Sequence, residues 1–426
     1  MDHWRLASCR RWSCPVNGEG QVRAATAVSR RTLLTLAVVA GIGAANLYYN
    51  QPLLAQMSAG LHASRAAVGV VPVLTQAGYA CGLLLIVPMS DVLDPRRLMG
   101  WMAIQTGVAL VGIAVAPNVL WLQIASFLLG CSTVLPQLSV PTAVRFSPPA
   151  QRGSAVGVVM RGLLIGVILS RAYAGLLAPV VSWRGVYWIA AGFMVASALG
   201  IWRSLPAGQR HGRVAFWPVL RSLPSIARAD PILREATVLS GLVFGGLSCF
   251  WAALVFYVEK PPYSAGPRMV GLLALVGASG AIAAPRIGRL AGERATWLIA
   301  AAISSCVVGF ILLGVVGSAL AGLIVGTFLL DGGCQINEVS NLVRIFSHRD
   351  VEQGRANTVF MVGLFAGGAA GSALADWSWG VAGWTGVCAS GSALCLLALA
   401  ILALQTTRRP ETCRGVQRPA SFGEPS

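Results

Sequence analysis

Three ionisable residues, Arg161, Arg171 and Asp331, interrupt stretches of sequence that are otherwise apolar. An ionised side chain at bilayer depth costs at least ~2.5 kcal/mol on insertion scales, so each of these residues requires a partner or a function. Asp331 can bind and release a proton, whereas an arginine keeps its charge. A carboxylate and permanent cations inside apolar sequence therefore favour proton coupling, with static ion pairing as the alternative.

Catalytic chemistry has few residues to draw on. The four histidines fall in predicted tails or loops, and Lys260, the only lysine, is followed by Pro261 rather than by the Ser or Thr of a phosphate loop. Within the apolar stretches the carboxylates are Asp331 and Glu338, too few for hydrolytic or metal chemistry. The ten cysteines contain no Cys-x-x-Cys motif. We expect no enzyme activity, no metal and no cofactor, which leaves transport or sensing.

The elements that hold these residues are long apolar stretches. The 426 residues are 56% hydrophobic and only 11% charged, with a mean hydropathy of +0.70, which is too apolar for a soluble globule of this size. Stretches of about 20 apolar residues match the bilayer thickness, whereas barrel strands would alternate over ~10 residues. The fold class is therefore all-α integral membrane. Its twelve predicted transmembrane helices are 32–53, 66–88, 97–116, 119–141, 154–178, 184–204, 236–257, 268–288, 296–316, 319–343, 355–375 and 381–404.

The twelve stretches form two sets of six, which indicates an internal repeat. We predict a disordered cytoplasmic tail at 1–29, a six-helix bundle at 30–205, a cytoplasmic linker at 206–233, a second six-helix bundle at 234–405 and a second cytoplasmic tail at 406–426. A membrane sensor would normally add a sizeable output domain, for which these tails and this linker are too short.

The formal charge of +17 follows the predicted topology. If the first tail is cytoplasmic, most of the 32 lysines and arginines fall on the cytoplasmic side, and only Arg65, Arg184, Lys260 and Arg268 fall in outer loops or helix ends. This is the positive-inside pattern, which predicts that both termini are cytoplasmic. The charge then faces anionic lipid and gives no reason to expect a nucleic-acid partner.

The chain resembles a known family of transporters. Residues Ala45–Leu54 read Ala-Asn-Leu-Tyr-Tyr-Asn-Gln-Pro-Leu-Leu, and further landmarks lie at Gly162–Gly166, Trp183–Trp188 and Arg355–Thr358. With these motifs the chain resembles bacterial drug and metabolite exporters of the major facilitator superfamily over nearly all of residues 30–404. The resemblance implies two six-helix repeats around a central cavity, alternating access, a monomer and a place in the bacterial inner membrane.

The resemblance also implies a cytoplasmic latch between the second and third helices. The family's loop of the form Gly-x-Leu-Ala-Asp-Arg-x-Gly-Arg-Arg survives here as Asp91 with Arg96 and Arg97. An acid and two arginines at a helix junction can hold neighbouring helix ends together. In the second half, Glu293 stands one residue after the corresponding acidic position. The alternative is a basic loop that only sets the topology.

In the resembled fold the helices at 154–178 and 319–343 are neighbours, so we expect Arg171 and Asp331 to form a pair beside the cavity. Protonation of Asp331 would release the arginine and shift the balance of states. Arg161, nearer the cytoplasm, would either reach Glu338 or extend to the interface. The polar and aromatic residues predicted to line the substrate cavity are Asn46, Tyr49, Asn50, Gln123, Gln137, Trp251, Asn337 and Asn341, each with interhelical hydrogen bonding or lipid-facing packing as the alternative.

Glycines at four-residue spacing in the helices at 66–88, 154–178, 268–288 and 355–375 predict close contacts across the two halves. The favoured function is proton-coupled efflux of a small organic solute, with the proton gradient as energy source. The helix at 154–178 lacks the proline of the exporter signature, so a proton-coupled importer or an uncoupled facilitator remains the alternative. A sensor that binds a ligand without moving it is a further alternative.

Overall fold

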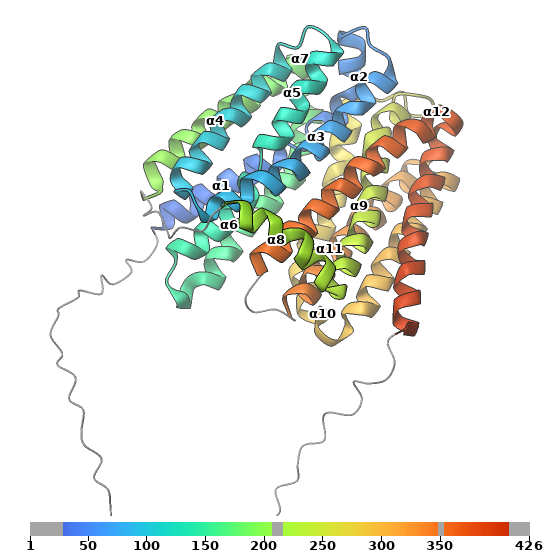
Figure 1. The fold of residues 1–426 in the computed structure, drawn as a ribbon. Helices are drawn as coiled ribbons and strands as arrows, with labels where there is room; N and C mark the ends of the chain where they lie inside the picture. Colours follow the sequence, from blue (N-terminus) through green and yellow to red (C-terminus); the bar gives the residue numbers. More distant parts are fainter. Residues whose placement is uncertain (1–28, 207–215, 348–352, 409–426) are drawn as a thin grey trace, which may run out of the picture.

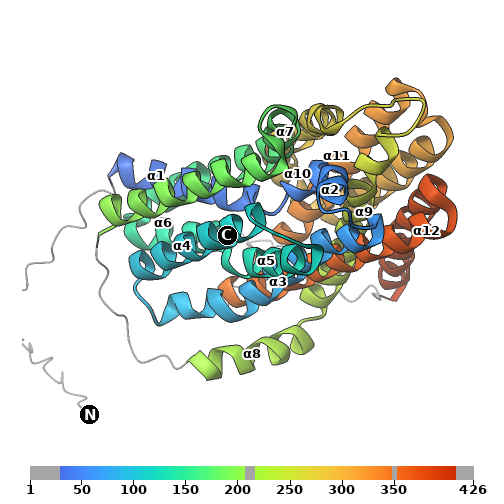
Figure 2. The same cartoon turned by 90° about the horizontal axis from the view of Figure 1, so that it is seen from above.

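The computed structural model describes residues 29–206, 216–347 and 353–408, and within these ranges the side chains of 91, 216, 278–294, 353 and 406–408 are not described. The described residues are almost entirely helical (Figure 1). The helices form two groups side by side, one from each half of the chain, as the end-on view also shows (Figure 2).

The helices of the N-terminal half are α1 Arg30–Ala45, α2 Asn50–Gly60, α3 Arg65–Ile86, α4 Pro95–Ala114, α5 Val119–Ser132, α6 Leu135–Phe146 and α7 Arg152–Ser204, with 3-10 turns η1 Val87–Asp91 and η2 Pro149–Gln151. Those of the linker and the C-terminal half are α8 Phe216–Ala229, α9 Pro231–Val258, α10 Pro267–Val316, α11 Leu320–Phe346 and α12 Gln353–Arg408.

Three of these helices are too long for one membrane crossing. The 53 residues of α7 would extend about 80 Å if straight, against about 30 Å of hydrocarbon, and α10 and α12 contain 50 and 56 residues. The chain reverses inside α7 at Ser182 (φ 62°) and inside α12 at Ala382 and Gly383 (φ 59°). With two spans in each long helix, the described residues contain the twelve predicted spans, arranged as two groups of six.

Polar residues set where several spans begin. Ser64 accepts a hydrogen bond from the backbone N–H of Ala67 at the start of α3, and Asn118 accepts one from Trp121 at the start of α5. Asp230 caps α9 by accepting from Ile232 and Leu233. Side-chain caps of this kind satisfy backbone donors that have no partner within the helix. They end the loops and fix the level at which each span starts.

The first span differs from its prediction at 32–53. It is broken at residues 46–49, between α1 and α2, bends there by 45° and continues to Gly60. The fourth span is also broken, at Thr133 and Val134 between α5 and α6. The predicted linker at 206–233 contains a helix of its own, α8. Hydrophobicity alone gave the number of spans but not these breaks.

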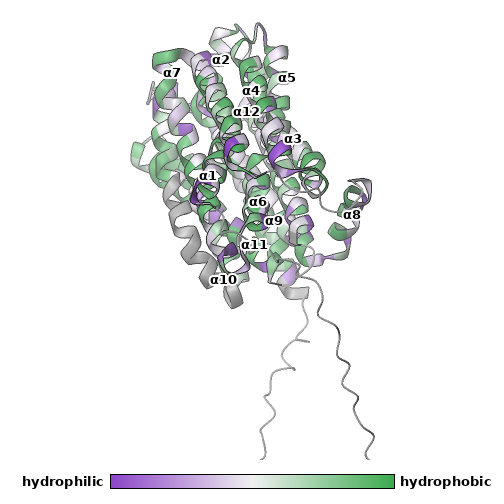
Figure 3. Ribbon diagram, turned by 90° about the vertical axis from the view of Figure 1, so that its left-hand side faces the viewer, coloured by the Kyte–Doolittle hydropathy of each residue, from purple (hydrophilic) through white to green (hydrophobic). Residues whose placement is uncertain are grey.

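The two halves meet mainly along α3 against α12 and along α7 against α10. We call the side of the molecule where α1 begins and α12 ends the tail side, and the opposite side the far side (Figure 1). Many large apolar residues of the spans are exposed, which agrees with lipid contact, and the ribbon coloured by hydropathy is mostly apolar along the described spans (Figure 3).

The predicted role of the glycine stripes is wrong for most of them. A Cβ on Gly166 would lie 2.0 Å from the carbonyl oxygen of Gly41, so this glycine packs α7 against α1 within the N-terminal half. A Cβ on Gly371 would lie 1.9 Å from the carbonyl oxygen of Gly245, which packs α12 against α9 within the C-terminal half. Four-residue spacing identifies a close-packed face but not the helix that it meets.

Candidate functional site

Three residues from three spans form a buried polar arrangement between the halves. Arg171 of α7 places its guanidinium carbon 4.3 Å from the centre of the Trp251 indole of α9. The indole Nε1–H donates a hydrogen bond of 3.3 Å to Oδ1 of Asp331 in α11. Arg171 is 8% exposed and Trp251 is 1% exposed. One ring thus contacts the cation of the N-terminal half and the anion of its own half.

The remaining partners of Arg171 come from the first span. Its Nε–H donates to Oε1 of Gln51 in α2, and its guanidinium carbon lies 4.5 Å from the centre of the Tyr48 ring. A cation over an aromatic face gains about 2 kcal/mol when it is desolvated. The two rings and the amide therefore compensate part of the cost of burying this charge.

Arg171 and Asp331 were predicted to form a pair, and the structure gives the geometry of their interaction. The two charges interact electrostatically, but among the described residues they form no ion pair within 4.0 Å, and Trp251 stands between them. Each residue lies 11 residues, about 16 Å, from the far-side end of its span, at Ser182 and Leu320. Both charges therefore sit near the middle of a ~30 Å hydrocarbon layer.

The second carboxylate oxygen of Asp331 is exceptional. Oδ2 is buried and has no hydrogen-bond partner among the described residues. It faces the backbone of Gly277 in α10, where a Cβ would lie 2.1 Å from it. A buried carboxylate oxygen without a donor is costly as an anion and is stabilised by a proton.

The predicted cavity residues of the first span pack within the N-terminal half. Asn46 donates 3.3 Å to Oγ1 of Thr133, and Asn50 donates 3.1 Å to Oγ1 of Thr75. The oxygens of both amides are buried, and neither has a hydrogen-bond partner in the part of the chain that the structure describes. The ring of Tyr49 lies 5.1 Å from that of Tyr173. These contacts link spans within the N-terminal half.

The two predicted glutamines lie in different places. Gln123 donates 2.8 Å to the carbonyl of Ala67 and joins α5 to α3 within one half. Gln137 of α6 accepts a 3.2 Å hydrogen bond from Asn357 of α12. Gln137 therefore contributes a polar contact between the two halves, nearer the tail side.

A buried ion pair inside the C-terminal half was not predicted from the sequence. Arg344 of α11 lies 3.0 Å from Glu235 of α9, and the two side chains are 8% and 5% exposed. The predicted residues Asn337 and Asn341 both donate to Oγ of Ser240 beside it, at 3.3 and 3.2 Å. The predicted spans 236–257 and 319–343 stopped just short of both charged residues, which hid the pairing.

The predicted latch is described only in part, since the side chains of Asp91 and Glu293 lie outside the described residues. Arg96 donates to the carbonyl of Trp202, which joins the start of α4 to the end of α7 within one half. Arg97 is exposed. Arg161 is also exposed, which agrees with extension to the interface rather than contact with Glu338.

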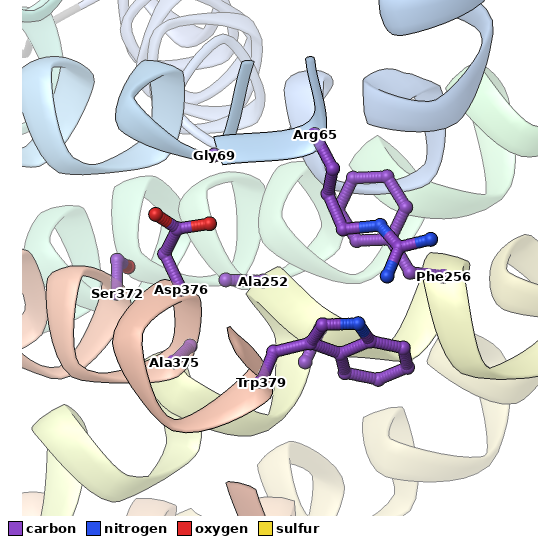
Figure 4. A pocket seen from close by; sticks show the side chains of 9 residues that line it. Arg65, Gly69, Ala252, Phe256, Ser372, Ala375, Asp376 and Trp379 are labelled. Atoms are coloured by element: carbon purple, nitrogen blue, oxygen red, sulfur yellow. The ribbon is translucent and has the colours of Figure 1, made fainter. Parts of the chain in front are cut away.

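A second polar arrangement between the halves lies toward the far side (Figure 4). The guanidinium of Arg65, the first residue of α3, lies between the rings of Phe256 and Trp379, at 4.6 and 4.9 Å from their centres. One turn further along α3, a Cβ on Gly69 would lie 2.8 Å from Oδ1 of Asp376. These residues line a small pocket between α3, α9 and α12.

Further along α3, the polar side chain of Gln76 contacts the C-terminal half. Gln76, 2% exposed, donates 3.0 Å to Oγ of Ser372 and accepts 3.3 Å from Oγ of Ser248. Gly368 leaves the space, because a Cβ there would lie 1.9 Å from Oε1 of Gln76. The Gln76 amide of the N-terminal half is thus hydrogen-bonded to two serines of the C-terminal half.

Comparison with known proteins agrees with this architecture. The family model described as Major Facilitator Superfamily matches residues 33–343. "Uncharacterized transporter YgaY" of Escherichia coli O157:H7 is 30% identical over 375 residues, which cover 88% of this chain and 95% of that protein. "Chloramphenicol resistance protein" of Streptomyces lividans is 24% identical over 253 residues, 57% of this chain and 63% of that protein.

A solved structure shares the fold. A bacterial homologue of the human lysosomal transporter Spinster, in an inward-facing and unoccupied conformation, matches with a TM-score of 0.67 at 14% identity and covers 88% of this chain and 95% of that one. The family match spans well over half of the sequence, and the twelve spans form the expected two groups of six. The chain therefore belongs to the Major Facilitator Superfamily, whose members are multi-pass membrane transporters and not enzymes.

Proposed function

We propose that this transporter exports a small organic solute in exchange for protons, by alternating access between its two halves. The observation that carries the proposal is Asp331, a carboxylate near mid-membrane with one oxygen bonded to Trp251 and the other without a donor. Buried carboxylates in membrane spans are expensive and commonly serve proton relays. Asp331 meets the opposite half through one side chain, that of Trp251, whose ring contacts Arg171.

The proposed coupling runs through Trp251. With Asp331 ionised, its charge attracts Arg171 of the other half, and the indole dipole between them is aligned by its hydrogen bond to Oδ1. A proton on Oδ2 removes that charge, so Arg171 loses its counter-charge while its contacts with Tyr48 and Gln51 persist. The electrostatic attraction between the two halves near mid-membrane is then weaker, and the populations of the two access states shift.

Efflux is favoured over import by the name of one relative. The relative in Streptomyces lividans is called a chloramphenicol resistance protein, and resistance by a transporter implies export. We further propose that the chain lies in the bacterial inner membrane with its tail side cytoplasmic, which the positive-inside pattern supports as an orientation. We propose that the solute binds near Arg171 and Trp251, with Gln137 and the free amide oxygens of Asn46 and Asn50 as further polar contacts.

Inside-out vesicles are the first test. Uptake driven by a pH gradient is screened over drugs, nucleosides, sugars and amino acids, with empty vesicles as the background. Uptake that collapses when the gradient is dissipated supports proton-coupled efflux. Uptake that does not respond to the gradient identifies an uncoupled facilitator, and uptake only in right-side-out vesicles identifies an importer. Ligand binding without uptake in either orientation identifies a sensor.

The coupling role of Asp331 is tested with the solute found in that screen. In proteoliposomes, Asp331→Asn is expected to abolish proton movement coupled to solute, while solute exchange at equal pH continues. Glu338→Gln is the matched control, because Glu338 lies in the same helix, two turns nearer the tail side, and among the described residues forms no hydrogen bond or ion pair with the other half. Undiminished coupling in Asp331→Asn, or its loss only in Glu338→Gln, would overturn this assignment.

A further inference from the structure

Helix α8 lies outside the two groups of spans and runs across them. It extends transversely to the bundle in the side view, and in the end-on view it lies beyond the outline of the spans (Figures 1 and 2). It packs against η1 of the N-terminal half and against α9 and α12 of the C-terminal half. Leu85 and Leu93, on either side of η1, are exposed apolar residues. Helix α8 thus occupies the edge of the protein at the level where the spans leave the membrane.

The two faces of α8 differ sharply. Val219, Leu223 and Ile226 are 3–6% exposed and form the face that packs on the protein. The opposite face is a stripe at spacings of four, three and four residues, which we call the α8 stripe: Trp217, Arg221, Pro224 and Arg228. At 100° per residue these four lie within about 60° of one another, directly opposite the buried face.

The composition of the α8 stripe indicates its surroundings. Trp217 is 63% exposed, whereas tryptophan is highly buried on average in proteins surrounded by water. At the boundary of a bilayer, by contrast, tryptophan sits at the level of the headgroups and arginine contacts phosphate. A helix that lies in the membrane plane typically shows this combination.

We propose that the α8 stripe binds the headgroups of anionic phospholipids, with Arg221 and Arg228 on the phosphates and Trp217 among the headgroups. The two guanidiniums are seven residues apart, about 10 Å along the helix, which is wide enough for two neighbouring lipids. Because α8 touches both halves, lipid bound to the stripe also holds one connection between them at the membrane surface. This inference does not depend on the transported solute or on proton coupling.

The test uses the full chain and needs no transport assay. The purified protein is exposed to equal amounts of phosphatidylglycerol and phosphatidylcholine with identical acyl chains, and retained lipid is counted by native mass spectrometry. Arg221→Gln/Arg228→Gln is expected to reduce the preference for phosphatidylglycerol roughly fivefold or more. Arg152→Gln/Arg203→Gln, which removes two exposed arginines elsewhere on the tail side, is the matched control and is expected to keep it.

Two further arms decide between explanations. Arg221→Lys/Arg228→Lys retains both charges and is expected to restore the preference, whereas a loss equal to that of the glutamine variant would overturn recognition by charge. A photoreactive phenylalanine analogue at position 217 is expected to form adducts with phosphatidylglycerol in vesicles. No lipid adduct, or adducts with a soluble cell protein instead, would overturn the proposal, as would an unchanged lipid preference in the double glutamine variant.

Discussion

The two interfaces between the halves are built from different groups. Where α3 meets α12, with α9 beside them, the contacts are polar and aromatic side chains: Arg65 lies between a ring of α9 and a ring of α12, and Gln76 is hydrogen-bonded to Ser372. Between α7 and α10 the backbones touch directly: a Cβ on Gly175 would lie 2.4 Å from the carbonyl oxygen of Pro267 and 2.9 Å from the Cα of Gly271. When the α3–α12 interface opens, water can replace its side-chain contacts. The α7–α10 interface has few side-chain contacts that water could replace.

This difference assigns separate mechanical roles. Side-chain hydrogen bonds and cation–π contacts have discrete formed and broken states, and each contributes about 1 kcal/mol. A glycine contact between helices permits small rotations without rotamer changes, but it tolerates no added atom. We therefore expect the α7–α10 interface to act as the pivot and the α3–α12 interface to open and close. Four measurements can break or sharpen that comparison.

The largest effect is expected for Gly175→Ala. The added methyl group meets backbone atoms that cannot move without separating α7 from α10, so overpacking should cost about 1–3 kcal/mol and impair transport strongly. The change is measured as the thermal unfolding midpoint in detergent and as solute uptake. Gly157→Ala, in the same helix with nothing within 4 Å, is the control and should be neutral or slightly stabilising. Equal losses in both variants would contradict a pivot at Gly175.

The next effect is expected for Arg65→Ala. Removal of both ring contacts should favour opening of the far side by about 1–2 kcal/mol. The labelling rate of a cysteine introduced at Ala252, in the pocket beneath Arg65, by a membrane-impermeant maleimide should then rise about 5- to 30-fold. Arg184→Ala removes an arginine that stacks on Trp183 of its own half, 4.2 Å from the ring centre, and should leave the rate unchanged. A rise of the labelling rate in both variants would indicate a general loss of packing rather than opening of the far side.

The features of the structure that could be predicted from the sequence are those that depend on local properties. Length and hydrophobicity of each stretch are local properties, and they gave the twelve spans. The cost of buried charge likewise identified Arg171 and Asp331 before any contact was known. Trp251 was expected only as one of the residues that line the substrate cavity, because its place between the two charges depends on how α9 rotates against α7. That rotation is a property of packing and is absent from the local sequence.

The sequence could not predict which helix each close-packed face or charged side chain contacts. Gly166 and Gly371 lie on correctly identified close-packed faces, yet each meets a helix of its own half. Arg65 was counted only as an outer charge, although Phe256 and Trp379 lie far along the chain from it. The amphipathic spacing of α8 was present in the sequence of the linker and could have been found by its four-three-four pattern.

A smaller effect is expected for Ser372→Ala. Loss of the 3.0 Å hydrogen bond from Gln76 should cost about 1 kcal/mol and raise the labelling rate at position 252 about fivefold. Ser378→Ala removes a 2.6 Å hydrogen bond to Ser390 within the C-terminal half. It should lower thermal stability by a similar amount without changing that rate. If Ser372→Ala lowers stability alone, its hydrogen bond does not contribute to opening.

The smallest effect is expected from Glu259, which follows α9 on the far side. Partial burial raises the pKa of its carboxyl above the ordinary value of 4.5, and Arg65 acts in the opposite direction. The closed interface therefore binds the proton more tightly than an open one, so closure is favoured at low pH and weakens as the pH rises through the raised pKa. The carboxyl is partly exposed, and solvent screening keeps the change small.

Glu259→Gln tests this dependence, because the amide cannot titrate. The labelling rate at position 252 in the parent should increase modestly as the pH rises above about 4.5, and the increase should flatten in Glu259→Gln. Arg65→Ala removes the group that lowers this pKa, so any remaining increase should begin at higher pH than in the parent. An identical pH profile in the parent and in Glu259→Gln would assign the titration to another group. Opening of the α3–α12 interface would then not depend on the carboxylate of Glu259.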